Sequence, residues 1–106
     1  MNTYTVHSTP NFDDLHDTLD GSEQKWIKRM KESLKNNQTG KIIRVPWFRE
    51  KKYLNKRLYF IVSEENKVVL LVAFGPKKNQ QKTINQIMAE MNNILNYVRN
   101  LSGSNS

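Results

Sequence analysis

The stretch FREKKYLNKRLYFIV, residues 48–62, decides the fold, because it has the pattern of two short strands that meet at Leu54-Asn55. Two-residue loops are the commonest hairpin connections, and the loop length determines which residues face each other. With this loop, three pairs face each other across the hairpin: Tyr53 with Lys56, Lys52 with Arg57, and Glu50 with Tyr59. We therefore expect a β-hairpin over these residues.

The approach to this turn is crowded with cations. If the loop has two residues, Lys52 faces Arg57, and like charges in that arrangement repel each other. A three-residue loop would instead place Lys51 opposite Arg57 and would reverse the faces of the strand. The cation pair needs either an anion to bridge it or a carboxylate to offset it, and Glu50 is available for the second role. The alternative is that these are ordinary charges on a solvated strand face.

The periodicity of the chain changes on either side of the hairpin. Strand-like patterns occur at residues 4–8, 42–53, 56–62 and 67–74, and helical spacing of apolar residues occurs at 9–19, 20–36 and 84–98. Val68–Phe74 is apolar throughout, as expected of a central strand covered on both faces. These patterns predict an α+β domain of order β-α-α-β-β-β-α. In this arrangement a helical hairpin and a long C-terminal helix pack on one face of a mostly antiparallel sheet.

Capping signals place the start of the first two helices. Thr9 followed by Pro10 offers an N-cap with proline at the first helical position. Asp20, with Glu23 three residues later, has the pattern of a capping box. We therefore expect one helix to begin at Pro10 and a second to begin directly after Asp20.

Length and composition limit what the chain can do. Its 106 residues suffice for one domain, which we assign to residues 1–101, with a polar, frayed tail at 102–106. The absence of cysteine excludes disulfides and thiolate chemistry, and the two histidines make a poor metal site. We expect no cofactor. No apolar run approaches the length of a membrane helix and no signal-peptide pattern is present, so a cytoplasmic protein is expected.

The charge of the chain is strongly positive and unevenly distributed. Seventeen Lys and Arg against ten Asp and Glu give a formal net charge of +7, which favours a polyanionic partner such as nucleic acid. Residues 1–21 contain four aspartates and no Lys or Arg, whereas residues 41–57 contain seven basic residues and one acid. The sequence therefore places the positive field in the middle of the chain.

A second basic cluster follows the apolar strand. The segment FGPKKNQQKT, residues 74–83, contains Lys77, Lys78 and Lys82 just past the expected end of that strand, where functional sites are often built. If the strand order brings this end beside the hairpin, these lysines converge with Lys52 and Arg57 on one concave patch. Aromatic residues interleave with the cations of the hairpin, a combination that suits phosphate contact and base stacking.

Four features occur in order within residues 41–85: Glu50-Lys51-Lys52, Arg57-Leu58-Tyr59-Phe60, the apolar strand Val68–Phe74, and Lys77-Lys78. Their order and spacing resemble the core of the RelE/ParE toxin superfamily. The resemblance implies a toxin of a toxin–antitoxin pair, with a cognate antitoxin protein as partner. RelE-like members cut messenger RNA in the ribosomal decoding site, and ParE-like members inhibit DNA gyrase.

The chemistry of the residues favours the RNA branch. RNA carries its own nucleophile, the 2′-hydroxyl, so strand scission needs no metal, only a proton acceptor, cations and a proton donor. We expect Arg57 to clamp the phosphate and the transition state, Lys52 to act as proton acceptor or second clamp, and Lys77 or Lys78 to contact the phosphate or the leaving group. Five further residues are expected to contact RNA: Arg49, Lys51, Lys56, Lys82 and Tyr59.

One feature departs from the family. RelE-like nucleases often carry a catalytic Tyr, or His and Asp, near the start of the last helix, whereas this chain has Ile84 there and no histidine after His16. This departure leaves two alternatives open beside a ribosome-dependent endonuclease. One is a ParE-like inhibitor of gyrase that acts through an exposed apolar helix face, and the other is a nucleic-acid-binding protein without catalytic activity.

Overall fold

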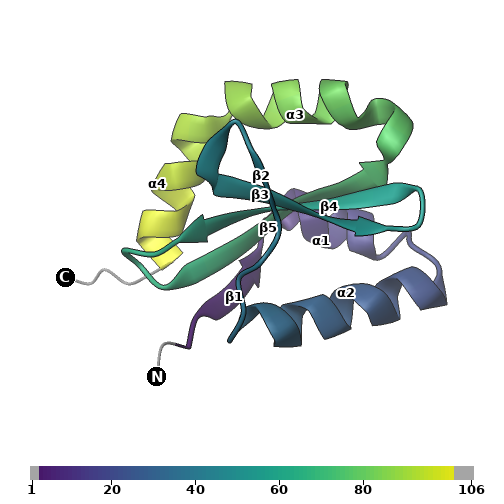
Figure 1. Ribbon diagram of the computed structural model, residues 1–106, viewed down its shortest axis with the longest axis horizontal. Helices are drawn as coiled ribbons and strands as arrows, with labels where there is room; N and C mark the ends of the chain where they lie inside the picture. The colour runs from purple at the N-terminus through teal and green to yellow at the C-terminus, as the bar shows by residue number, and fades with distance from the viewer. Residues whose placement is uncertain (1–2, 102–106) are drawn as a thin grey trace.

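The computed structural model describes residues 3–101 (Figure 1). It contains five strands, namely β1 (Thr5–Ser8), β2 (Lys41–Ile43), β3 (Val45–Tyr53), β4 (Lys56–Ser63) and β5 (Val68–Pro76). The helices are α1 (Pro10–His16), α2 (Gly21–Leu34), the 3₁₀ turn η1 (Lys77–Asn79), α3 (Gln80–Ala89) and α4 (Met91–Leu101). This is the α+β class that the sequence predicts.

The strands form one sheet of order β1-β5-β4-β3-β2, in which β1 runs parallel to β5 and all other neighbours are antiparallel. The β3–β4 hairpin has the two-residue loop, with Lys52 opposite Arg57 and Glu50 opposite Tyr59. The two-residue register is therefore confirmed, and the three-residue alternative is excluded. At the far edge, Arg44 takes a positive φ of 61° where β2 folds back onto β3.

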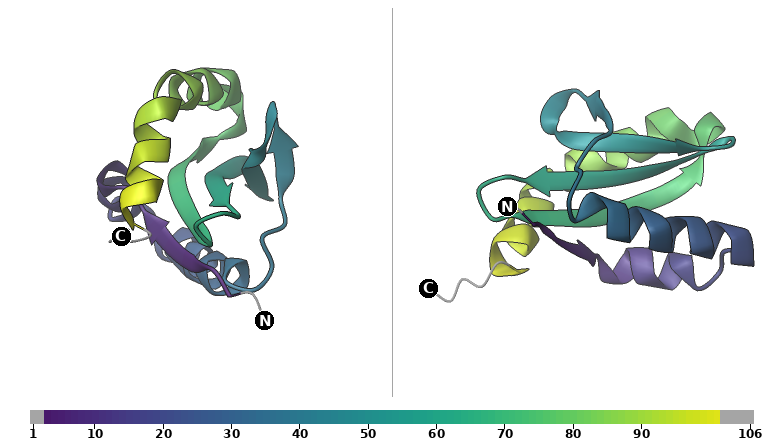
Figure 2. Two further views of the ribbon diagram at one scale, coloured as in Figure 1. Left: turned by 90° about the vertical axis from the view of Figure 1, so that its left-hand side faces the viewer. Right: turned by 60° about the horizontal axis from the view of Figure 1, so that its bottom comes forward.

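Helices cover both faces of the sheet, and the prediction that they share one face is wrong (Figures 1 and 2). α1 and α2 bury Phe12, Trp26 and Ile27 against one face, and α3 and α4 bury Ile84 and Val98 against the other. Side chains of β4 and β5 alternate between the two cores. The apolar strand β5 requires this arrangement, because a strand that is hydrophobic on both faces must be covered twice.

The expected long C-terminal helix is divided in two. The break lies at Glu90, which has φ −97° and ψ 7° and whose N–H donates to the carbonyls of Gln86 and Ile87, both at 3.1 Å. Neither proline nor glycine is present at the break, so periodicity continues across it and the sequence carries no signal of it. The break lets α4 turn away from α3 at the end of the sheet (Figure 2).

The predicted caps form as expected. Thr9 Oγ1 accepts a hydrogen bond from Phe12 N–H at 3.1 Å, with Pro10 at the first position of α1. Asp20 and Glu23 close a capping box at α2: Asp20 Oδ1 accepts from Glu23 N–H at 2.8 Å, and Glu23 Oε1 accepts from Asp20 N–H at 3.2 Å. The remaining carboxylate oxygen of Glu23 forms an ion pair with Lys56, so this buried side chain joins α2 to the hairpin.

Three other expectations concern a membrane helix, a metal site and the C-terminal tail. Within residues 3–101, no helix is long and apolar enough to cross a membrane. The same residues contain no group of three or more His, Asp or Glu side chains that could hold a metal ion. The prediction of a frayed tail at residues 102–106 lies outside the described residues.

Candidate functional site: a basic cluster at the hairpin end of the sheet

Four predicted site residues come together at one end of the sheet, and we call Lys52, Arg57, Lys77 and Lys78 the hairpin-end cluster. Arg57 lies between Lys52 on β3 and Gly75 on β5, each its direct partner across the sheet. The N–H of Lys77 donates to the carbonyl of Asn55 in the hairpin loop at 2.7 Å. The second basic cluster of the sequence therefore does lie beside the hairpin.

The members of the hairpin-end cluster differ in exposure. Lys52, Lys77 and Lys78 are exposed, whereas Arg57 is 7% exposed. An exposed lysine carries a compact charge on a flexible stem, a form that suits contact with phosphate. Arg57 lies on β4, between the strand that carries Lys52 and the strand that leads to Lys77 and Lys78.

The guanidinium of Arg57 is held by the hairpin itself. Its Nη1 donates to the carbonyls of Lys56 at 2.9 Å and of Leu54 at 3.4 Å. Its Nε lies 3.9 Å from Glu50 Oε2, and both side chains are buried. Glu50 therefore offsets the facing cations, which is the role that the sequence offered for it. Arg57 shapes the loop and supplies positive charge to the cluster from below.

Gln80, the first residue of α3, completes this buried arrangement and was missed by sequence reasoning. Its side-chain amide donates to Glu50 Oε1 at 2.6 Å, so that Glu50 is held by Arg57 on one side and by Gln80 on the other. Gln80 stands in a run of interchangeable amides, NQQ, so the sequence gives no signal that this particular residue points to the sheet.

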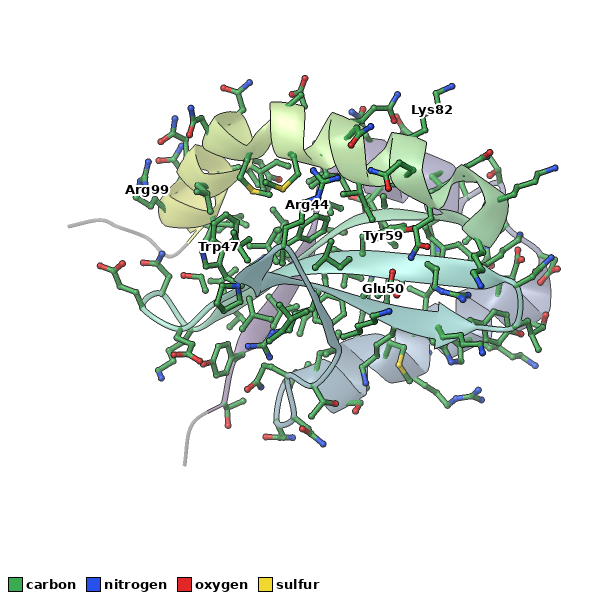
Figure 3. All side chains as sticks on the ribbon, turned by 45° about the horizontal axis from the view of Figure 1, so that its top comes forward. Arg44, Trp47, Glu50, Tyr59, Lys82 and Arg99 are labelled. Atoms are coloured by element: carbon green, nitrogen blue, oxygen red, sulfur yellow. The ribbon has the colours of Figure 1, made fainter. Side chains whose placement is uncertain are left out.

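Tyr59 lies next to Glu50 on the face of the sheet covered by α3 (Figure 3). Its side chain is fully buried, and among the described residues its hydroxyl has no hydrogen-bond partner of adequate geometry. Burial, reinforced by the charge of Glu50, raises the pKa of Tyr59 to about 12, against the opposing effects of Arg57 and the Gln80 amide. Tyr59 is therefore a neutral phenol at physiological pH, with no exposed ring face on which a base could stack.

The other predicted RNA contacts do not join the cluster. Lys56 is paired with Glu23 of α2, on the opposite face of the sheet from Glu50 and Tyr59. Lys51 donates to Thr39 Oγ1 at 3.1 Å. Arg49 donates to the backbone carbonyls of Gln38, which precedes β2, and of Pro46, at the start of β3. These three cations hold the structure of β3 and its neighbours in place.

Lys82 is exposed on α3, one turn beyond the hairpin-end cluster, and points away from the sheet (Figure 3). It extends the positive surface without contacting the buried groups. Together these positions describe a surface of three exposed lysines, supported by a buried Arg57–Glu50–Gln80 arrangement. Such a surface can bind phosphate groups and can stabilise negative charge that develops on them.

Solved structures share this arrangement of strands and helices. A double arginine-to-alanine mutant of E. coli toxin RelE in the free state superposes with a TM-score of 0.66 at 15% identity, over 74% of this chain and 88% of that chain. The chain has the RelE fold.

Two further structures agree with the RelE fold. The intact E. coli RelBE toxin–antitoxin complex matches with a TM-score of 0.62 at 17% identity, over 69% of this chain and 95% of that chain. The RelE mutant in complex with an antitoxin RelBc peptide matches with a TM-score of 0.60 at 17% identity, over 76% and 94%. No family model matches the sequence, and no curated protein matches it either. The resemblance expected from the hairpin motifs is thus confirmed at the level of the fold.

Proposed function

We propose that the protein is the toxin of a toxin–antitoxin pair and that it cleaves messenger RNA bound to the ribosome. The observation that carries the proposal is that the segments bearing Lys52, Lys77 and Lys78 lie beside Arg57 at one end of a RelE-fold sheet. Structures with this fold are described as a toxin and as a toxin bound to its antitoxin, which supports both the activity class and the expected antitoxin partner.

The proposed chemistry uses the 2′-hydroxyl of RNA as nucleophile. Attack on the adjacent phosphorus forms a 2′,3′-cyclic phosphate and releases the 5′-oxygen, so that the leaving group takes up the proton that the 2′-hydroxyl gives up. We assign the direct contacts to the exposed lysines: Lys52 as proton acceptor or phosphate contact, and Lys77 and Lys78 on the phosphate or the leaving oxygen. Arg57 acts from below, because its guanidinium is already engaged with the hairpin carbonyls and Glu50.

Inhibition of gyrase through an apolar helix face has less support. Among residues 3–101, the exposed large hydrophobic side chains are Ile42 and Leu54, and neither lies on a helix. The apolar sides of α3 and α4 are packed against the sheet. An antitoxin is expected to cover the hairpin-end cluster with an acidic or amphipathic segment, since its own charge would then offset the lysines.

The test is cleavage mapping with ribosomes programmed with a defined messenger RNA, read by primer extension beside the same RNA without ribosomes. Lys52→Gln and Lys77→Gln should each abolish or strongly reduce the cuts. Lys67→Gln, which removes an exposed lysine from the β4–β5 turn at the other end of the sheet, is the matched control and should leave them unchanged. Arg57→Ala is a poor probe on its own, because it leaves the buried carboxylate of Glu50 without its cationic partner. The loss costs about 3–5 kcal/mol of folding free energy.

Cuts that require the ribosome and disappear in the Lys52 and Lys77 variants would support the proposal. If the wild-type protein binds programmed ribosomes but no cut appears with or without them, the endonuclease is refuted and a binding protein without catalytic activity remains. If the Lys67 variant loses the cuts equally, the effect is one of net charge, and the assignment of the hairpin-end cluster is wrong.

A further inference from the structure

A second positive surface lies on the outward face of α2. Trp26, Ile27 and Leu34 define the buried side of this helix. At 100° per residue, Lys25, Lys28 and Arg29 point to the opposite side, and all three are exposed. We call these three residues the α2 basic face.

The cations of the α2 basic face form no ion pair within the described part of the chain, although one acid, Glu32, lies on the same side of the helix. The nearest acid on that side of the helix, Glu32, is paired with Lys35 at 2.9 Å. The other acid of α2, Glu23, is buried and paired with Lys56. Within residues 3–101, none of the three cations has a carboxylate oxygen within the 4.0 Å of an ion pair. They are therefore available to an external anion.

The α2 basic face and the hairpin-end cluster are separate sites. α2 covers one face of the sheet, whereas the groups beneath the hairpin-end cluster, Glu50 and Tyr59, lie on the face covered by α3 (Figures 1 and 2). The sheet and its helical layer stand between them. A single phosphate bound by Lys52 and Lys77 cannot also contact α2.

From this arrangement we infer that the α2 basic face binds the phosphate backbone of structured RNA, as a second contact that works independently of the hairpin-end cluster. Three cations on two adjacent turns of a rigid helix can follow a phosphate backbone, and duplex RNA is recognised mainly through its shape and its phosphates. The inference adds a binding surface to the proposed function and does not require cleavage.

The composition of the face favours RNA over an acidic protein. The cores of protein–protein interfaces are enriched in aromatic residues and Met and depleted of Lys. The α2 basic face has no exposed aromatic residue, and Met30 on the neighbouring side of the helix is partly buried against the core. A surface of unpaired cations without an apolar centre suits a polyanion whose binding is driven by release of counterions.

The test is the binding of a short RNA duplex as a function of salt concentration. The variant Lys25→Gln, Lys28→Gln, Arg29→Gln should bind about tenfold or more weakly at low salt, and the slope of log K against log salt should fall by about two to three. The matched control removes three exposed cations elsewhere, as Lys41→Gln, Arg44→Gln, Lys67→Gln, and should change both quantities much less. Thermal unfolding followed by circular dichroism verifies that both variants fold.

Each outcome decides the inference. If both triple variants lose the same affinity for the duplex, the effect is one of net charge alone and the inference is wrong. An unchanged slope of log K against log salt in the α2 variant would also overturn the inference. If the α2 variant loses binding to polyglutamate while keeping its affinity for the duplex, the face serves an acidic protein and the RNA assignment is wrong. If ribosome-dependent cleavage is never found but the α2 variant alone loses duplex binding, the proposed function fails and this inference stands.

Discussion

The side chain of Tyr59 is well placed for packing but poorly placed for hydrogen bonding. Its ring fills the core between the sheet and α3, while its hydroxyl lies buried without a hydrogen-bond partner of adequate geometry among the described residues. A buried polar group without a partner costs about 1–3 kcal/mol of folding free energy. We therefore expect Tyr59→Phe to leave the protein equally stable or more stable at pH 7, as measured by urea denaturation.

Tyr59 should also make the free energy of unfolding depend on pH in the alkaline range. The pKa of Tyr59 is raised to about 12 in the folded protein, from about 10 in the unfolded chain. Between these values the unfolded state releases its proton first, so the free energy of unfolding falls as the pH rises from 10 towards 12. The Tyr59→Phe variant should lose less stability than the wild type over that interval. Equal losses in the two proteins would show that the Tyr59 hydroxyl is not the group responsible.

At the scale of elements, the hairpin loop contains a conformation that its residue does not favour. Leu54 has a φ of 54° and is 74% exposed, so its side chain gains little from burial and its backbone is in the left-handed region. The left-handed region is unfavourable by about 1–2 kcal/mol for a residue with a Cβ, whereas glycine has no such steric cost. Leu54→Gly should therefore raise the free energy of unfolding by about 0.5–1 kcal/mol, measured by urea denaturation.

Asn55→Gly is the matched control for the loop, because Asn55 does not have a positive φ. Glycine at this position only increases the conformational entropy of the unfolded chain, so the variant should be slightly less stable than the wild type. A gain from Asn55→Gly equal to the gain from Leu54→Gly would contradict the role of the left-handed conformation.

The elements differ in how far the sequence could predict them. The hairpin register and both N-caps could be predicted because each depends on residues close together in the chain, such as Leu54-Asn55 or Asp20 with Glu23. The break at Glu90 could not, since the apolar stripe continues across it and the bend is stabilised by tertiary packing.

The placement of helices on both faces could have been predicted from the sequence. The strand Val68–Phe74 is apolar on both faces, so both of its faces must be packed against other elements. In the candidate site, the convergence of Lys52, Arg57 and Lys77 followed from strand register and order. The burial of Tyr59 and the contact of Gln80 with Glu50 depend on where α3 crosses the sheet, which no local pattern encodes.

At the scale of the whole molecule, two cores share one sheet and should unfold together. Trp26 lies in the core under α1 and α2, and Trp47 packs against the core under α3 and α4, so each tryptophan reports on one layer. Loss of either layer would expose the alternate side chains of β4 and β5 to water. In Trp26→Phe and Trp47→Phe, the midpoint of unfolding by fluorescence should therefore equal the midpoint by circular dichroism.

Each variant serves as the control for the other, because each keeps one tryptophan and changes one core. A fluorescence midpoint that precedes the circular dichroism midpoint in the Trp26→Phe variant would show that the α3–α4 layer opens first. The same order in the Trp47→Phe variant, which keeps Trp26, would show that the α1–α2 layer opens first. Either result would mean that the sheet does not couple the two cores.

The carboxylate of Glu23 has a consequence for how this chain can change over generations. One of its oxygens closes the start of α2 and the other holds Lys56 of the hairpin, so two distant elements depend on one side chain. Gln at position 23 would keep the cap but give up the charge, and Asp would be too short to serve both partners. A compensating replacement at position 56 could repair only half of the loss. Position 23 should therefore accept few substitutions, although Glu23 itself takes no part in the proposed chemistry.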